Sequence, residues 1–225
     1  MITNRMTARI VGACFLFSNV VFLTGALVFV EPILGSPDYL TLASANSTKL
    51  LVGALLEMLN GVAYLGIAVF MFPIFKKRFE SLALGYIAFR VIEFVAQILS
   101  DLSPMALISL SEQYLKAGSP VGSSFQVLGS LLLAERFWAF QMVAITLSLG
   151  AFLFYTMLYK TRLIPRFISI WGFLGAAIVL INTILDMVGI PPGNLGFVML
   201  LNELFLGVWL IVKGFNEPET AAESI

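Results

Sequence analysis

The chain has 225 residues, 60% of them hydrophobic and 12% charged, and its mean hydropathy is +0.98; soluble domains are about half apolar and about a quarter charged, so an ordinary soluble fold is excluded. The net charge is zero and histidine is absent, which argues against a nucleic-acid surface and removes the commonest metal ligand and general base. The single cysteine, Cys14, excludes an internal disulfide, and we expect no metal and no cofactor.

Six apolar stretches are long enough to cross a membrane, since a helical span needs about 20 apolar residues. In chain order they cover residues 10–30, 50–75, 82–102, 137–158, 167–188 and 195–212. These stretches predict an all-α integral membrane protein. We expect a single domain of six transmembrane helices over residues 1–214, followed by a polar C-terminal tail over residues 215–225.

Basic residues are distributed unequally between the two sides of this arrangement. Three lie on one side, Lys49, Lys116 and Arg136, and Arg90 lies inside a span. The other side, with both termini, holds the remaining nine: Arg5, Arg9, Lys76, Lys77, Arg78, Lys160, Arg162, Arg166 and Lys213. Cytoplasmic loops are enriched in Lys and Arg, so both termini are predicted to be cytoplasmic. The expected location is a cell membrane, the bacterial inner membrane.

Two connections have distinctive compositions. Residues 103–136 form the longest one, on the outer side, where 107–114 and 125–135 have helical character and Gly118, Ser119 and Pro120 form a break. We expect short helices there, lying on the outer face as a lid. The basic connection 162–166 either anchors the topology or binds anionic lipid headgroups, and membrane lipid is the expected partner.

Charged and amide side chains interrupt the predicted span 82–102. Arg90, Glu93, Gln97 and Asp101 are spaced by three, four and four residues, so they line one face of a helix. A charge in hydrocarbon is costly and usually faces a protein interior or a wet cavity, where it usually has a use. This face is therefore a candidate binding surface.

Three other spans carry similar groups at a similar depth. From the helical rise, Glu57, Glu93 and Glu203 lie about 10 to 13 Å from the outer ends of their spans, Asn182 about 9 Å, and Arg90 about 18 Å. The shared level predicts one polar chamber that opens outward. The predicted ligand-binding residues are Glu57, Asn60, Arg90, Glu93, Gln97, Asn182, Asp186, Asn202 and Glu203.

The charges inside the predicted chamber do not balance. Three glutamates against Arg90 leave an excess of two carboxylates, so we expect bound protons, a cation, or a cationic or polyhydroxyl ligand. Alternatively, these residues only hold the helices together, but interhelical hydrogen bonds in a membrane contribute about 0.6 kcal/mol on average. That is a weak reason to keep four charges inside.

Three classes of function fit this pattern. The first is a transporter or ligand-binding membrane protein that uses the chamber. The second is an intramembrane enzyme with a carboxylate as acid or base on a lipid-linked substrate, although the chain has no zinc motif and no nucleotide-binding loop. The third is an accessory or sensory subunit whose 103–136 connection meets a partner.

Ordered motifs along nearly the whole chain resemble one known family. They are Arg9-Ile10-Val11-Gly12, Glu57-x-x-Asn60, Tyr86-x-x-x-Arg90-x-x-Glu93, Leu163-Ile164-Pro165-Arg166, and Asn202-Glu203 followed by Trp209-Leu210-Ile211-x-Lys213-Gly214-Phe215. Together they resemble the domain of unknown function 4386 family of bacterial membrane proteins. The resemblance implies an integral membrane protein, and it places Arg90, Glu93, Asn202 and Glu203 inside the shared motifs.

Overall fold

Helices make up all the regular secondary structure of the residues that the structure describes, as predicted. This computed structural model describes residues 4–120, 122, 124–191, 193 and 196–216, and the predicted polar tail lies outside them from residue 217 on. The elements are α1 (Asn4–Leu23), the π-helix η1 (Thr24–Val30), α2 (Glu31–Leu34), α3 (Tyr39–Ala45), α4 (Ser47–Lys116), α5 (Ser124–Thr161), α6 (Arg166–Met187) and α7 (Phe197–Val212).

Four helical segments are long and apolar enough to cross a membrane. They are Asn4–Leu34, Ser47–Lys116, Ser124–Thr161 and Arg166–Met187. The remaining predicted span corresponds to α7, a shorter apolar helix of 16 residues. These segments indicate a multi-pass membrane protein. Six crossings and cytoplasmic termini stay predictions.

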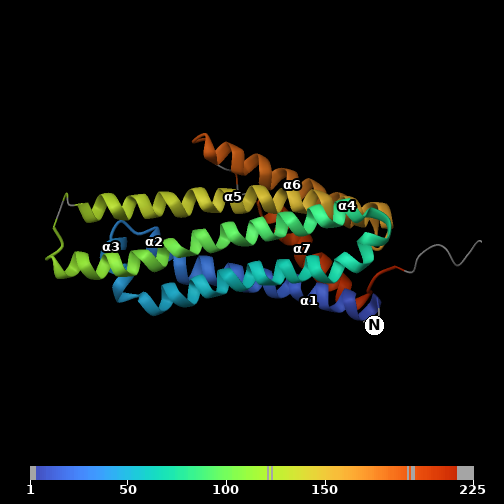
Figure 1. Ribbon diagram of the computed structural model, residues 1–225, viewed down its shortest axis with the longest axis horizontal. Coiled ribbons are helices and arrows are strands. Elements are labelled where there is room, and N and C mark those ends of the chain that lie inside the picture. Colours follow the sequence, from blue (N-terminus) through green and yellow to red (C-terminus); the bar gives the residue numbers. More distant parts are fainter. Residues whose placement is uncertain (1–3, 121, 123, 192, 194–195, 217–225) are drawn as a thin grey trace, which may run out of the picture. The chain divides into compact units, whose positions relative to one another are not determined.

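The longest element, α4, contains two of the predicted spans. It has 70 residues and is two helices joined at Phe79, whose backbone angles (φ −140°, ψ 56°) are not helical. Figure 1 shows the chain reversing its direction within α4. The basic residues before Phe79 thus lie at a tight bend, where the sequence predicts the 76–81 connection.

The expectation of separate short helices within residues 103–136 is wrong. Residues 107–114 and 125–135 are helical, but they continue α4 and α5. The break falls between these helices, where Gly118, Ser119 and Gly122 have φ values of 80°, 56° and 68°. Left-handed backbone of this kind suits glycine and ends a helix, so the composition predicts the position of the break correctly.

Pro104 lies inside α4, beyond the predicted span 82–102. A proline inside a helix has no N–H for the carbonyl four residues earlier, which here is that of Ser100. The Arg136 Nη1 donates to this carbonyl at 3.3 Å. A side chain from α5 therefore replaces the missing backbone donor, as membrane helices with internal prolines require, and α4 continues.

Contacts divide the chain into two compact units, which are described separately. Unit 1 contains the described residues of Met1–Asn19, Ala63–Glu93 and Ala144–Ile225, and unit 2 contains Val20–Val62 and Phe94–Val143. Helices α4 and α5 thus contribute to both units. The single domain over residues 1–214 stays a prediction.

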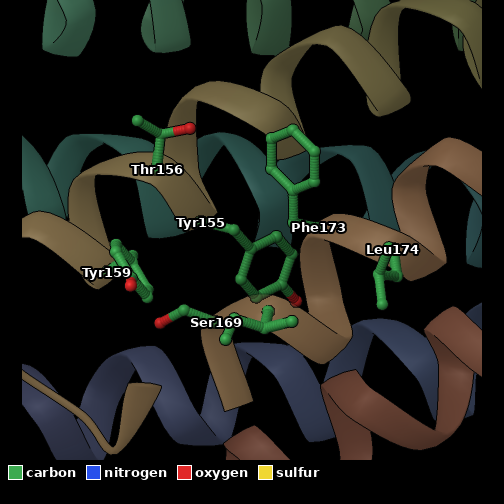
Figure 2. A pocket seen from close by; sticks show the side chains of 7 residues that line it. Tyr155, Thr156, Tyr159, Ser169, Phe173 and Leu174 are labelled. Atoms are coloured by element: carbon green, nitrogen blue, oxygen red, sulfur yellow. The ribbon is translucent and has the colours of Figure 1, made fainter. Parts of the chain in front are cut away.

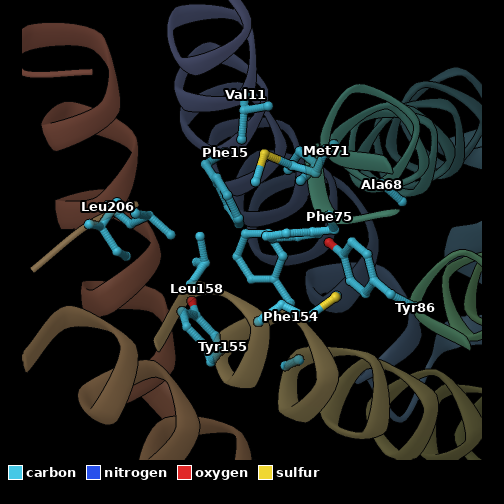
Figure 3. Close-up of a cluster of buried hydrophobic side chains, with 14 of the residues drawn as sticks. Val11, Phe15, Ala68, Met71, Phe75, Tyr86, Phe154, Tyr155, Leu158 and Leu206 are labelled. Carbon is cyan, nitrogen blue, oxygen red and sulfur yellow. The ribbon is translucent and has the colours of Figure 1, made fainter. Parts of the chain in front are cut away.

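The core of unit 1 is rich in aromatic rings (Figure 3). The Phe154 ring centroid lies 5.8 Å from that of Phe15, 5.9 Å from that of Phe75 and 5.2 Å from that of Tyr86. Offset and edge contacts of this kind contribute about 0.5–1.5 kcal/mol per pair beyond the burial of area. Side chains of α1, α4 and α5 are thereby fixed around the polar groups described below.

Helices α1 and α7 approach each other closely at Gly12 and Gly207 in unit 1. A methyl group on Gly12 would lie 2.6 Å from the Gly207 carbonyl oxygen and 2.9 Å from the Ile211 side chain. A backbone oxygen cannot move without shifting its helix, so Gly12→Ala is expected to destabilise the protein by about 1–3 kcal/mol. Unfolding in mixed detergent micelles, followed by circular dichroism, measures this change.

The matched control is Gly66→Ala, also in a helix of unit 1. A methyl group at Gly66 meets nothing within 4 Å, and alanine favours helix by about 1 kcal/mol over glycine. The control variant is expected to be as stable as the parent or slightly more stable. Close packing at Gly12 is contradicted if both variants behave alike.

Unit 2 has a smaller apolar core, in which α3 packs on the end of α4. Leu40, Ala43, Leu107 and Tyr114 are among its buried members. The Ser111 hydroxyl donates to the Leu40 carbonyl and accepts from the Ser44 backbone N–H at 3.0 Å. These bonds hold the segment after η1 against α4.

The π-helix η1 also belongs to unit 2. Pro32, which follows it, has no N–H, so the α-helical ladder cannot run unbroken through this segment. Gly25 of η1 lies against α4, where an added methyl group would be 2.9 Å from the Gly53 carbonyl oxygen and 3.3 Å from Glu57 Cγ. Single π-turns are frequent at functional sites, and this one adjoins a buried glutamate.

Candidate functional site

The buried charges of the described residues form two polar networks, one in each unit. Six charged side chains are buried: Glu57, Arg90, Glu93, Asp101, Arg136 and Glu203. Network 1, in unit 1, consists of Asn19, Tyr64, Tyr86, Arg90, Glu93 and Glu203. Network 2, in unit 2, consists of Glu57, Gln97, Ser100, Asp101 and Arg136.

Network 1 is built around an ion pair within α4. The Arg90 Nη1 donates to Glu93 Oε1 at 2.9 Å and to Oε2 at 2.7 Å, and the spacing of three residues places both side chains on one face. The Arg90 guanidinium carbon lies 4.5 Å from the Tyr64 ring centroid and 5.2 Å from that of Tyr86. Such cation–π contacts contribute about 2 kcal/mol when desolvated, so Arg90 is held from two sides.

Glu203, from α7, completes network 1 with neutral donors. The Tyr64 hydroxyl donates to Glu203 Oε2 at 2.5 Å, and Asn19 Nδ2 donates to the same oxygen at 3.3 Å. Glu203 is only 4% exposed. No basic side chain of the described residues forms an ion pair with it. In network 1, Glu93 is therefore paired with a cation, whereas Glu203 is held by an amide and a hydroxyl.

Asn202, next to Glu203, connects three helices of unit 1. Its Oδ1 accepts from the Tyr155 hydroxyl at 2.6 Å, and its Nδ2 donates to the Ile168 carbonyl at 3.0 Å. These bonds join α7 to α5 and α6. Asn202 therefore fixes the rotation of α7 about its axis, and with it the direction in which the Glu203 side chain projects from the helix.

In network 2, Arg136 and Gln97 are shared by two carboxylates. The Arg136 Nη2 contacts both Glu57 oxygens at 3.0 and 3.1 Å, and its Nη1 lies 3.6 Å from Asp101 Oδ1. Gln97 Nε2 donates to Glu57 Oε2 at 3.2 Å and to Asp101 Oδ1 at 3.0 Å. The two carboxylates are thus held close together by the same two donors.

Three buried polar atoms of network 2 have no hydrogen-bond partner in the protein. They are Gln97 Oε1, Ser100 Oγ and Asp101 Oδ2, all within about one turn of α4. Buried polar atoms are nearly always paired with protein or with ordered water. This turn of α4 is therefore the part of network 2 best placed to take a water molecule or a proton.

The structure gathers most of the predicted residues but divides them between the networks. Arg90, Glu93 and Glu203 meet in network 1, and Glu57 and Gln97 meet in network 2, while Asn60 is buried in unit 2. Asn182 is not brought to either network: it is half-buried, and its Nδ2 donates to the Gly193 carbonyl at 3.3 Å. Asp186 is also half-buried. A ligand-binding role for the set stays a prediction.

The sequence analysis counted Arg136 among the basic residues of the outer side and did not predict that its side chain is buried. Arg136 is only 8% exposed, because its long side chain runs from the helix to Glu57 and Asp101. The sequence signal for this pairing was a basic residue at the start of one predicted span together with a glutamate without a partner near the outer end of another. With Asp101 and Arg136 included, four buried carboxylates face two arginines, so the excess is still two, one in each network.

These features define the class: a helical protein of membrane type, with paired charges buried inside its units. The family model of the domain of unknown function DUF4386 matches residues 10–214, and the chain belongs to this family. No curated protein and no solved structure matches the chain significantly. In the described part of the chain, no group of three or more Cys, Asp or Glu side chains is placed to hold a metal ion.

Proposed function

We propose that this chain is a six-span protein of the bacterial inner membrane, with both termini in the cytoplasm, and that it binds and exchanges protons at its buried carboxylates. Its membrane location is supported by the four long apolar segments and the family. The proton as ligand is supported by the buried carboxylates and the charge of each network, taken separately. Proton relay is one of the functions that buried ionisable residues serve in other membrane proteins.

The observation that carries the proposal is the environment of Glu203. This carboxyl group is buried, yet its two partners in network 1 are the neutral Tyr64 hydroxyl and the Asn19 amide. A carboxylate that is paired with arginine must break an ion pair when it takes up a proton. Glu203 can gain or lose a proton with only a rearrangement of these hydrogen bonds, so it is the exchanging group in network 1.

The charge of each network supports the same conclusion. Two carboxylates and one arginine leave one negative charge when all are ionised. A charged residue near the middle of a bilayer costs about 2.5–3.5 kcal/mol on insertion scales. One bound proton removes the excess charge in either network, and its release restores the charge.

The proposal is tested by infrared spectroscopy of the purified full chain in lipid. A buried protonated carboxyl group gives its own carbonyl-stretching band, which is expected in the parent protein at neutral pH. Glu203→Gln is expected to remove the part of this band that arises from network 1. Glu80→Gln, at an exposed glutamate in the same unit, is the matched control and is expected to leave the band intact.

Two further measurements keep the test decisive. Tyr64→Phe removes one donor to Glu203 and is expected to shift the band without abolishing it, which separates an effect on Glu203 from a loss of folding. A pH-sensitive dye inside reconstituted vesicles then reports whether E203Q also slows proton flux. A band that is identical in the parent and E203Q overturns the role of Glu203.

A further inference from the structure

A shallow apolar trough lies between α5 and α6 on unit 1, and none of its lining residues belongs to network 1 (Figure 2). It has a volume of about 260 Å³. Four of its residues are among the exposed large hydrophobic side chains: Tyr159 is 39% exposed, Ile170 49%, Phe173 41% and Leu174 55%. The trough is thus open to the surroundings of the unit. In a membrane helix, an open apolar surface is in contact with the acyl chains of lipid.

The Arg166 guanidinium lies at one end of this trough. Arg166, the first residue of α6, places its guanidinium carbon 4.9 Å from the ring centroid of Tyr159, which lines the trough. Leu174 is eight residues further along α6, about 12 Å by the helical rise. The trough therefore runs from a charged end, in the connection that the sequence places at the cytoplasmic surface, into the apolar part of the helix.

A hydroxyl group without a partner lies between these ends. Ser169 lines the trough, is 1% exposed, and its Oγ has no hydrogen-bond partner in the protein. It follows Arg166 by three residues, so it stands less than one turn deeper on a nearby face of α6. A donor at this depth suits the ester oxygens of a phospholipid, which lie just below the headgroup.

We propose that the trough binds one phospholipid with an anionic headgroup. The phosphate and its negative headgroup pair with the Arg166 guanidinium, the Ser169 hydroxyl donates to an ester carbonyl, and one acyl chain lies along Phe173 and Leu174. A basic residue near the membrane surface favours anionic lipid. Lys160, in the last turn of α5, is directed to the Phe79 ring, with its Nζ 5.6 Å from the ring centroid, so the headgroup contact is assigned to Arg166. This site goes beyond the proposed proton exchange and does not depend on it.

The experiment uses the purified full chain and an equal mixture of phosphatidylglycerol and phosphatidylethanolamine, with retained lipid counted by native mass spectrometry. The parent is expected to retain phosphatidylglycerol about fivefold better than phosphatidylethanolamine, since one basic group near a membrane surface provides about that preference. Arg166→Gln is expected to abolish the preference, and Ser169→Ala to weaken retention of both lipids. Leu174→Trp fills the trough and is expected to prevent retention of either lipid.

Lys77→Gln is the matched control, because Lys77 is exposed and lies on the same predicted side of the membrane but away from the trough. It is expected to keep the full preference. Circular dichroism of each variant confirms that the helices are intact, which is expected because Arg166 and Leu174 are exposed. If R166Q keeps the preference of the parent, or if L174W retains as much lipid as the parent, the trough is not the lipid site.

Discussion

Arg136→Gln is expected to lower the free energy of unfolding by about 3–5 kcal/mol, the cost of leaving a buried charge without its partner. The substitution removes the cation that contacts Glu57 at 3.0 Å and Asp101 at 3.6 Å. Glu57 is fully buried and Asp101 is 1% exposed, so water cannot replace the guanidinium. The Ser100 carbonyl also loses its donor, at the position where Pro104 provides none.

Unfolding in mixed detergent micelles measures this effect, with Lys116→Gln as the control at an exposed cation in the same unit. The double variant Arg136→Gln with Glu57→Gln is expected to recover much of the lost stability, because it removes the unpaired charge together with its partner. Equal losses in R136Q and K116Q would mean that Arg136 does not neutralise network 2.

The second large effect is expected for Arg90→Met, again about 3–5 kcal/mol. Glu93 loses both of its short hydrogen bonds, at 2.7 and 2.9 Å, and the Tyr64 and Tyr86 rings lose the cation between them. Arg90→Met with Glu93→Leu is expected to restore stability, because well-packed apolar residues often replace a buried ion pair at no cost.

Infrared spectroscopy of the same double variant distinguishes structure from function in network 1. If the pair serves stability alone, the double variant keeps the Glu203 infrared band of the parent. If the positive charge also governs proton release, the double variant folds but its Glu203 band responds to pH differently. Lys77→Met, at an exposed residue of unit 1, controls for the loss of a positive charge, and a single R90M variant as stable as this control would contradict the buried pair.

The helices were predictable because length and hydropathy decide them. A stretch of about 20 apolar residues satisfies its backbone only as a helix in lipid, and α6 begins within one residue of the predicted span. The break at Gly118, Ser119 and Pro120 was recognisable because glycine accepts positive φ. The family was recognisable too, since its motifs extend over most of the chain.

The composition of the networks was only partly predictable. Helical spacing placed Arg90 and Glu93 on one face, and the structure pairs them. Depth along a helix does not specify which neighbour a face meets, so the sequence could not predict which side chains pair within each unit, and the shared chamber stays a prediction. The missed residue, Arg136, lies one position before a predicted span, where the length of its side chain decides its burial.

The π-helix and the unbroken end of α4 were beyond prediction for a related reason. Pro104 has no N–H for the Ser100 carbonyl, and α4 continues through it with a donor from Arg136 of α5 in that place. In η1, Pro32 interrupts the α-helical ladder, but the apolar sequence before it does not specify the wider π-turn. The continuation of α4 depends on a partner that is distant in sequence.

The partners in network 2 become available in a fixed order as the chain is synthesised, because they lie at different positions along it. Asp101 precedes Arg136 by 35 residues (136 minus 101), and a ribosome adds these in roughly 2–7 s at 5–20 residues per second. Of the two side chains that donate to these carboxyl groups, Gln97 and Arg136, Gln97 alone has been synthesised until then. A neutral amide, and not the guanidinium, is therefore the first partner that a nascent α4 hairpin can offer to Glu57 and Asp101.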